Sequence, residues 1–449
     1  MSNSQRQSVE WESKATPRAF SLPRRRGEGG RRPDEGWGDQ RRRTSPLTPA
    51  LSPPPRKGEG ASASWLLAIT PNLFPNWYEG RRRSLVIGHS TLAILCSLAI
   101  GHGLFCSAAE APLNLGPDRV DASVKGGVGF LVRAQLPDGM IQEKDKRENH
   151  GVAMTALAVM GLASVGHQPV DKTTEGEALR KAVVFLLRPD VTSANGYYGQ
   201  KDGSRMYGHG IVTLALTELL GMGVDKAQDG LLRDRAQRGV NLILAAQRVR
   251  KHDPRFIGGW RYSPDAGDAD LSVTVWQLLA LRSAKNAGLV VPKEAIDAAV
   301  GYLRRSYFSA RDAQGRLADP RSAFGYVPGQ SPVYAMAAAG LLAMQVCGLP
   351  AAPEVLGAAD WLRANAPVWE TQNFFYGTYY YSQGMHKRGG DVAREARERV
   401  EGLLTVHQMP DGSWDGAQGS ESAEGKVYCT ALALLSLSVR HHYLPIYQD

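Results

Sequence analysis

The chain has 449 residues and a formal net charge of +9, which at first suggests a basic protein of two or three domains. The excess charge lies at the start: residues 1–83 hold 16 basic and 8 acidic side chains, whereas residues 110–449 hold 37 and 36. Binding to nucleic acid needs a concentrated basic face, so this distribution argues against a nucleic-acid partner for residues 110–449. These residues are numerous enough to bury a large core.

The N-terminal part has two segments of different character. Residues 1–80 are rich in Arg, Pro and Gly, which predicts a disordered low-complexity extension. Residues 81–109 contain three arginines, an uncharged apolar stretch and a final Ser-Ala-Ala, the layout of an export signal. A membrane anchor over residues 84–106 is the alternative. We therefore expect an exported protein, in the periplasm or at the cell surface, with no membrane contact beyond this segment.

Beyond residue 115 the sequence alternates two kinds of helical segment six times. The first kind carries charged residues on one face, as in residues 392–404. The second kind is apolar nearly all round, as in residues 152–162, and a helix of that kind must be buried on both sides. We predict an all-α fold over residues 110–449: an (α/α)6 toroid of six helical hairpins arranged in two concentric rings.

A Gln near the end of a charged helix recurs before a Gly-containing turn, and a Trp follows the turn in two copies. The residues concerned are Gln135, Gln247 with Trp260, and Gln408 with Trp414. We expect them to act as structural staples, the amide accepting hydrogen bonds from the free N–H groups that begin the next helix and the indole covering it.

This pattern resembles the QW repeat of the terpene cyclase and protein prenyltransferase superfamily, which includes the squalene–hopene cyclases. The resemblance implies a toroid with a central aromatic cavity and, for the cyclases, an isoprenoid protonated by a D-x-D-D acid. Asp268 and Asp270 match D-x-D, and Leu271 replaces the last acid. The prenyltransferases bind zinc through an Asp-x-Cys pair and a His, but here Cys429 stands at the His position. We predict no metal and no cofactor.

Residues just before the apolar helices mark one rim of such a toroid and are the candidates for catalysis: Asp268, Asp270, His150 and His209. A proton donor of this kind needs a carboxyl group kept neutral by burial or by neighbouring carboxylates. The alternative for the aspartates is that one of them is the N-cap of the third apolar helix. The alternative for the histidines is capping or solvent exposure.

Aromatic residues of the same segments are the candidates for the cavity lining. The predicted set is Tyr207, Trp260, Arg261, Tyr262, Trp276, Phe324, Tyr326, Tyr334, Phe375, Tyr376, Tyr379, Tyr380 and Tyr428. Such rings stabilise carbocations, stack on sugars or grip peptides, and the alternative is core packing. Because Tyr379, Tyr380 and Tyr381 cannot all face one side of a helix, at least one should point inward.

Three hypotheses for function follow. The first is that the cavity binds or transforms an isoprenoid or terpenoid, so that the partner is a hydrophobic or elongated small molecule. The second is a non-catalytic exported toroid that binds a peptide, glycan or lipid. The third is a polysaccharide lyase or hydrolase of the same architecture, which would use the histidines, Arg261, Tyr262 and the two aspartates.

Overall fold

The computed structural model describes residues 118–143, 150–416, 421–441 and 443–448. The predicted extension (1–80) and the predicted signal or anchor (81–109) lie outside these residues, so export stays a prediction. Within the described ranges, no helix combines the length and the apolar character that a bilayer span requires.

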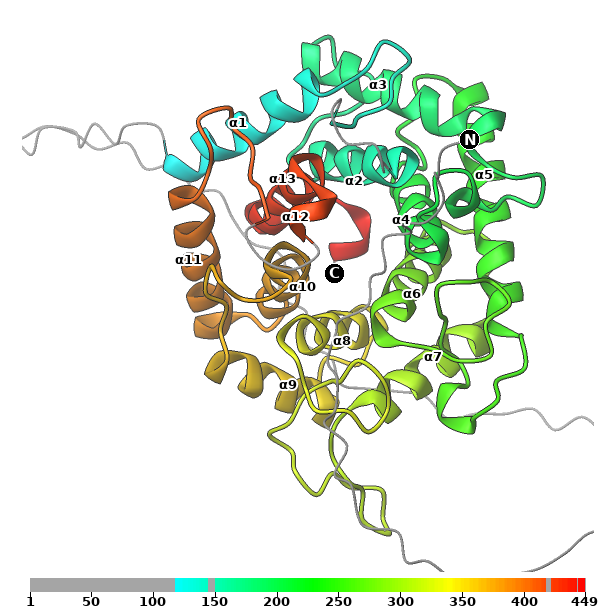
Figure 1. Cartoon of the computed structure of the whole chain (residues 1–449), viewed down its shortest axis with the longest axis vertical. Coiled ribbons are helices and arrows are strands. Elements are labelled where there is room, and N and C mark those ends of the chain that lie inside the picture. Colours follow the sequence, from blue (N-terminus) through cyan, green and yellow to red (C-terminus); the bar gives the residue numbers. More distant parts are fainter. Residues whose placement is uncertain (1–117, 144–149, 417–420, 442, 449) are drawn as a thin grey trace, which may run out of the picture. The chain divides into compact units, whose positions relative to one another are not determined.

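The helices form two concentric rings, which Figure 1 shows end-on. The outer helices are α1 (Arg119–Arg133), α3 (Thr174–Leu187), α5 (Lys226–Gln247), α7 (Lys293–Ser306), α9 (Pro353–Ala364) and α11 (Gly390–Val406). The inner helices are α2 (Gly151–Ser164), α4 (Arg205–Glu218), α6 (Leu271–Asn286), α8 (Tyr334–Val346), α10 (Phe374–His386) and α13 (Lys426–Leu437). A short helix, α12 (Glu421–Glu424), precedes α13.

Contacts between neighbouring helices close the inner ring. Each inner helix packs on the next one along the chain, and α13 packs on both α10 and α2. In the outer ring, α1 contacts both α3 and α11. The predicted (α/α)6 toroid of six hairpins is therefore confirmed.

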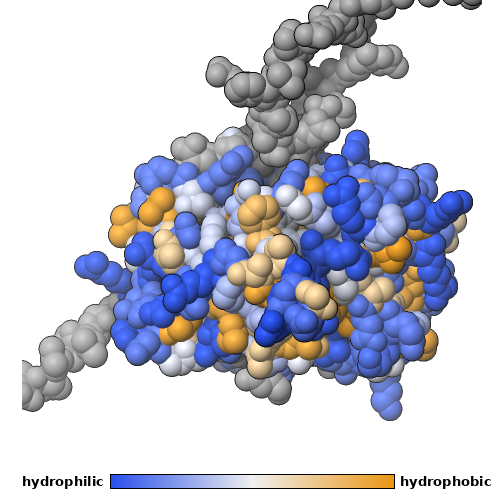
Figure 2. Space-filling view, turned by 90° about the horizontal axis from the view of Figure 1, so that it is seen from below, coloured by the Kyte–Doolittle hydropathy of each residue, from blue (hydrophilic) through white to orange (hydrophobic). Residues whose placement is uncertain are grey.

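Residue character explains which helices lie inside. Every residue of α2 is buried, whereas the buried residues of α11 are Ala396, Val400 and Leu404. That four-residue spacing forms one narrow stripe, so α11 can cover the ring on one side and meet water on the other. Figure 2 accordingly shows an outer face that is mostly hydrophilic with scattered hydrophobic side chains.

The Gln–Trp pairs hold the turns between hairpins, but the direction of the amide hydrogen bonds is the reverse of the prediction. The Nε2 group of Gln247 donates to the carbonyl oxygens of Gly258 and Ala295, at 3.0 and 2.9 Å. Gln135 and Gln408 make equivalent pairs of bonds. The turn presents carbonyl oxygens to the amide, and a carbonyl with two lone pairs can accept a second donor. The indoles of Trp260 and Trp414 donate to the preceding outer helix, at 2.8 Å each.

A threonine of the inner helix completes these turns. The backbone N–H of Trp260 donates to Thr274 Oγ1 at 3.0 Å, and that of Trp414 donates to Thr430 Oγ1 at 3.1 Å. The turn therefore lies directly against the start of its inner helix. This places the loop between residues 260 and 270 at the end of the ring where the inner helices begin.

Candidate functional site

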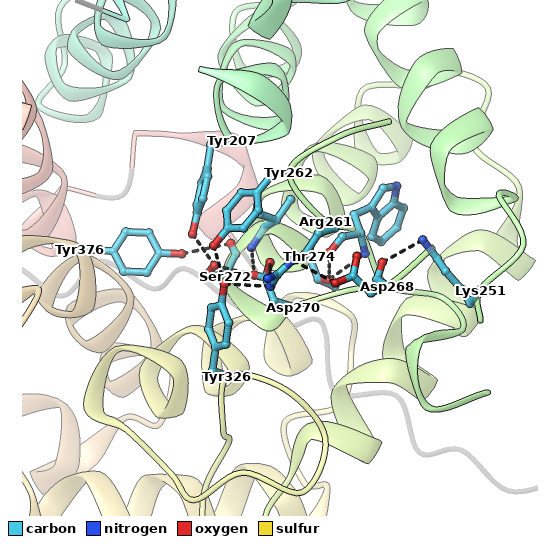
Figure 3. Close-up of polar contacts among 12 residues, drawn as sticks. Tyr207, Lys251, Arg261, Tyr262, Asp268, Asp270, Ser272, Thr274, Tyr326 and Tyr376 are labelled. Carbon is cyan, nitrogen blue, oxygen red and sulfur yellow. Dashed lines mark hydrogen bonds and ion pairs between the residues drawn. The ribbon is translucent and has the colours of Figure 1, made fainter. Parts of the chain in front are cut away.

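The site is built on the loop that leads into α6. Trp260 and Asp270 pair as an antiparallel bridge, with the N–H of Asp270 donating to the Trp260 carbonyl at 3.0 Å. The residues between them therefore form a closed loop beside the N-terminus of α6. Arg261, at the start of this loop, is brought against Asp268 and Asp270 at its end (Figure 3).

Asp270 is the N-cap of α6, as the alternative prediction held. Its Oδ1 accepts hydrogen bonds from the N–H of Val273 at 2.9 Å and from the hydroxyl of Ser272 at 2.6 Å. Its Oδ2 lies 2.9 Å from Nη1 of Arg261. Burial raises the pKa of Asp270, and these three donors limit the rise. All three favour the ionised carboxylate over the neutral acid that alkene protonation needs.

Arg261 is held between two tyrosine rings. Its guanidinium carbon lies 4.6 Å from the centroid of Tyr262 and 5.6 Å from that of Tyr326. Nη1 donates to the Tyr326 hydroxyl at 3.0 Å, and Nε lies 3.3 Å from Asp268 Oδ2. The two tyrosine hydroxyls are 2.5 Å apart. The guanidinium therefore has one fixed orientation, with a quarter of the Arg261 side chain exposed.

We call Arg261, Lys251, Asp268 and Asp270 the wall of this site, and their charges balance in number. Arg261 and Lys251 are positive, and Asp268 and Asp270 are negative. Lys251 Nζ donates to the carbonyl oxygens of Ala266 and Asp268, at 2.9 and 3.2 Å, and burial lowers the pKa of this lysine. Sequence reasoning missed Lys251, because its hydrogen-bond acceptors lie 15 and 17 residues further along the chain and no sequence motif marks the pairing.

Two further tyrosines join the wall to the inner ring. Tyr207 of α4 hydrogen-bonds the hydroxyl of Ser272, and Tyr376 of α10 donates to the Ser272 carbonyl at 3.1 Å. Tyr207, Tyr262 and Tyr326 are half-buried, although most of the inner ring is fully buried. We call Tyr207, Tyr262, Tyr326 and Tyr376, with Arg261, the tyrosine mouth (Figure 3).

A layer of packed aromatic side chains lies beneath the tyrosine mouth. Trp276 stacks on Tyr379 with centroids 5.7 Å apart and planes at 15°, and it also contacts Tyr376 and Tyr380. Tyr379 and Tyr380 thus reach from α10 to α6 across the inner ring, which confirms that at least one of the three consecutive tyrosines points inward. Tyr428 of α13 is also buried, and burial raises its pKa well above the usual value.

The C-terminal segment enters the ring below this layer. The hydroxyls of Tyr447 and Tyr379 are hydrogen-bonded, and the N–H of Ile446 donates to Glu218 Oε2 at 3.0 Å. Ser283 donates to the other oxygen of Glu218, and burial raises the pKa of this glutamate to about 7. Figure 1 shows this segment, drawn in red, inside the ring. Sequence reasoning missed it, because its partners lie more than 60 residues away.

Several predicted site residues do not reach the tyrosine mouth. Trp260, Phe324 and Phe375 are fully buried and face neighbouring elements, Phe324 against Tyr307 and Phe375 against Trp369. Tyr334 hydrogen-bonds Thr378 and contacts Tyr381.

The two histidines do not join Arg261 either. His209 faces the outer ring, where Nε2 lies 3.0 Å from the Gly239 carbonyl and Nδ1 accepts the N–H of Tyr198 at 3.4 Å. Burial lowers the pKa of His209 to about 4, so it is neutral at pH 7. Its Nδ1 accepts the backbone N–H of a turn residue, as threonine hydroxyls do in other hairpins. His150 Nδ1 lies 2.9 Å from the Asp202 carbonyl. The described residues contain no cluster of His, Cys, Asp and Glu suited to a metal ion.

Comparison with known proteins finds no matching family model and no matching curated protein. Among solved structures, a variant of the type II terpene cyclase MstE from Scytonema is 15% identical, with a TM-score of 0.46, over 73% of this chain and 98% of its own. The α-1,6-mannanase GH76A of Salegentibacter is 10% identical, with a TM-score of 0.46, over 72% and 99%. A protein from Actinoplanes is 18% identical, with a TM-score of 0.45, over 71% and 99%.

Proposed function

We propose that this toroid binds a neutral, hydroxyl-rich ligand, a segment of a glycan, at the tyrosine mouth. The observation that supports this most is the charge-balanced wall in which Arg261 is held between two half-buried tyrosine rings. An ionic ligand would find little net attraction there, because two acidic and two basic groups cancel. Uncharged hydroxyl groups of a ligand can instead form individual hydrogen bonds with the donors and acceptors of these side chains.

The donors and acceptors of the wall suit neighbouring hydroxyl groups. Nη2 of Arg261 has no hydrogen-bond partner among the described residues, and the side chain of Asp268 is 37% exposed. A hydroxyl can accept from the guanidinium while its neighbour donates to the carboxylate. The tyrosines beside them offer flat apolar faces with polar edges, which suit the C–H faces of a sugar ring.

The short distance between the tyrosine mouth and the aromatic layer beneath it favours a short ligand segment over a long folded chain. Tyr380 lies four residues beyond Tyr376 on α10, and Trp276 lies four residues beyond Ser272 on α6. One helical turn rises about 5.4 Å, so the packed aromatic layer begins roughly that far below the mouth. Tyr447 then occupies the position beneath Tyr379.

An isoprenoid ligand is the second candidate, and the aromatic layer of Trp276, Tyr379 and Tyr380 beneath the tyrosine mouth favours it. Such rings would attract a developing carbocation. Asp270 is fully buried and both of its carboxylate oxygens are engaged, by Val273, Ser272 and Arg261, which argues against a reaction in which it protonates the ligand. A lyase reaction would need a tyrosine base with a lowered pKa, whereas burial raises the pKa of both Tyr207 and Tyr326.

Calorimetric titration of the full chain tests the proposal with neutral oligosaccharides, uronate oligosaccharides and geranylgeraniol. We expect binding of neutral oligosaccharides, weakened about tenfold or more in Arg261→Gln, because a hydrogen-bonding guanidinium is removed. Arg255→Gln is the matched control, since Arg255 is exposed, pairs with Asp253 and lies, like Arg261, in the segment that connects α5 to α6. Binding of geranylgeraniol alone would favour the second candidate, and equal losses in both variants would count against the tyrosine mouth.

A further inference from the structure

The end of the inner ring opposite the tyrosine mouth, which we call the far end, holds the C-terminal segment, residues 443–448. Glu218, which the segment contacts, is the last residue of α4, whereas Tyr207 of the tyrosine mouth lies in the first turn of that helix. At about 1.5 Å per residue, the two positions are roughly 16 Å apart along the helix axis. A single 3-10 turn of the segment, Pro445–Tyr447, packs on α6 (Figure 1).

The segment lies in the ring in the way that a bound peptide lies in its site. Leu444, Ile446 and Tyr447 are buried, and they are its anchors. His441 and Tyr443, which precede the anchors, are exposed. Because the chain that leads to the anchors is at the surface, the segment can leave the ring while α13 keeps its contacts with α2 and α10.

Two buried polar groups of the ring have their hydrogen-bond partners in this segment. Oε2 of Glu218 accepts the backbone N–H of Ile446 at 3.0 Å, and Ser283 donates to the other carboxylate oxygen. The hydroxyl of Tyr379 is hydrogen-bonded to that of Tyr447. Neither Oε2 nor the Tyr379 hydroxyl has another hydrogen-bond partner among the described residues. Without the segment, both would be buried and unpaired, which is costly.

These groups select a peptide over a purely apolar occupant. A segment that only filled the ring would need no carboxylate, because buried polar contacts can be replaced by apolar groups of the same shape at little cost. The far end instead places a carboxylate oxygen opposite a backbone N–H and a hydroxyl opposite the phenol of the next residue. An oxygen acceptor that faces a main-chain donor recognises a peptide chain as such, and the neighbouring hydroxyl recognises tyrosine.

We propose that the far end of the ring is a peptide-binding site, and that the C-terminal segment is its intramolecular ligand, which a peptide of the same pattern can replace. The pattern is an apolar residue at the position of Leu444, an apolar residue with a free N–H at that of Ile446, and a tyrosine at that of Tyr447. The site shares no residue with the tyrosine mouth, so it stands or falls independently of glycan binding there.

The test uses the full chain and a fluorescently labelled peptide of residues 443–448, with fluorescence anisotropy as the readout. The double variant Ile446→Ala, Tyr447→Ala weakens the resident segment and leaves the ring side chains unchanged. We expect it to bind the peptide at least about tenfold more tightly than wild type, because an occupied site lowers the fraction of competent molecules. Gln448→Ala, at an exposed position of the segment, is the control and should bind as weakly as wild type.

Altered peptides test the contacts without any change to the protein. N-methylation at Ile446 removes the donor to Glu218 and should weaken binding to the double variant about tenfold or more, since a hydrogen bond to a carboxylate is lost. Tyr447→Phe in the peptide removes only the hydroxyl and should weaken binding about tenfold or less. A scrambled peptide of the same composition should not bind.

Hydrogen exchange of the wild-type chain gives a second measurement, which decides the matter if circular dichroism shows that the double variant is unfolded. The amides of Ile446 and Tyr447 should exchange at least about tenfold faster than those of α13, because release of the segment does not require global unfolding. Equal exchange rates would overturn the proposal. The same holds if the folded double variant does not bind the peptide at millimolar concentration, or if the scrambled or N-methylated peptide binds as tightly as the original.

Discussion

At the scale of single residues, Asp270 combines two tasks. It caps α6 through Val273 and Ser272, and it neutralises Arg261. The D-x-D pattern places an acid at this point, and its position before an apolar helix predicts a cap. Its partner Arg261 could not be predicted, because the pairing depends on the bridge that brings residues 260 and 270 together.

Asp270→Asn should destabilise the fold, because it leaves the Arg261 guanidinium without its buried partner and weakens the cap. We expect a loss of about 1–3 kcal/mol in the free energy of unfolding, at the lower end of the range for broken buried pairs since Arg261 is partly exposed. Urea denaturation measures this loss. Asp268→Asn is the control and should change the free energy little, as its carboxylate is partly solvated. Equal effects would refute the special position of Asp270.

The aromatic residues show where residue-level prediction stops. An inner helix is apolar nearly all round, so its sequence does not distinguish the side that faces the ring centre from the side that faces the outer helices. Phe375 and Tyr376 are adjacent, yet Phe375 packs on Trp369 and Tyr376 on Trp276. For the same reason, the sequence does not show that His209 faces the outer ring and not the rim.

At the scale of elements, the turn between two hairpins depends on a glutamine that donates twice. A repeated Gln before a turn marks the element in the sequence, but the choice between donor and acceptor does not follow from the residue type. Both roles satisfy the amide, and only the arrangement of the turn carbonyls decides between them.

Substitution of Gln247 separates the two roles. Gln247→Glu would set a carboxylate against the carbonyl oxygens of Gly258 and Ala295, whereas Gln247→Ala only removes two hydrogen bonds. We therefore expect Gln247→Glu to be the more destabilising, with losses of about 1–3 kcal/mol for either change. Thermal and urea unfolding compare the two variants, and Gln314→Glu, at an exposed position, should be neutral. A Gln247→Glu variant as stable as wild type would mean that the side chain accepts from N–H groups instead.

At the scale of the whole toroid, the repeat pattern was sufficient to predict a closed double ring. One hairpin cannot bury an inner helix that is apolar on all sides, and six hairpins in a ring can. The C-terminal segment inside the ring is not a periodic feature. It is held by contacts such as that between Ile446 and Glu218, 228 residues apart, so no local sequence pattern predicts it.

Two buried glutamates hold non-repeating segments to the ring, and they predict how its stability depends on pH. Glu218 binds the C-terminal segment, and Glu421 accepts the N–H groups of Tyr376 and Phe375 at the start of α10. Burial raises the pKa of each from 4.5 to about 7. A carboxyl whose pKa is higher in the folded state favours folding when protonated, so its contribution is complete below about pH 4.5 and is lost as the pH rises through 7.

The melting temperature should therefore rise as the pH falls from 8 to 6.5, a window in which the folded state takes up protons at Glu218 and Glu421 and the unfolded state does not. His209 opposes this trend increasingly as the pH approaches and falls below 6.5, because its pKa falls from 6.5 to about 4 on folding and the unfolded chain binds a proton that the folded chain does not. Glu218→Gln and Glu421→Gln mimic the protonated groups, so each should remove part of the rise, and the double variant should remove most of it. Differential scanning calorimetry at pH 8.0, 7.2 and 6.5 measures the slope. A double variant with the slope of wild type would mean that other groups control it.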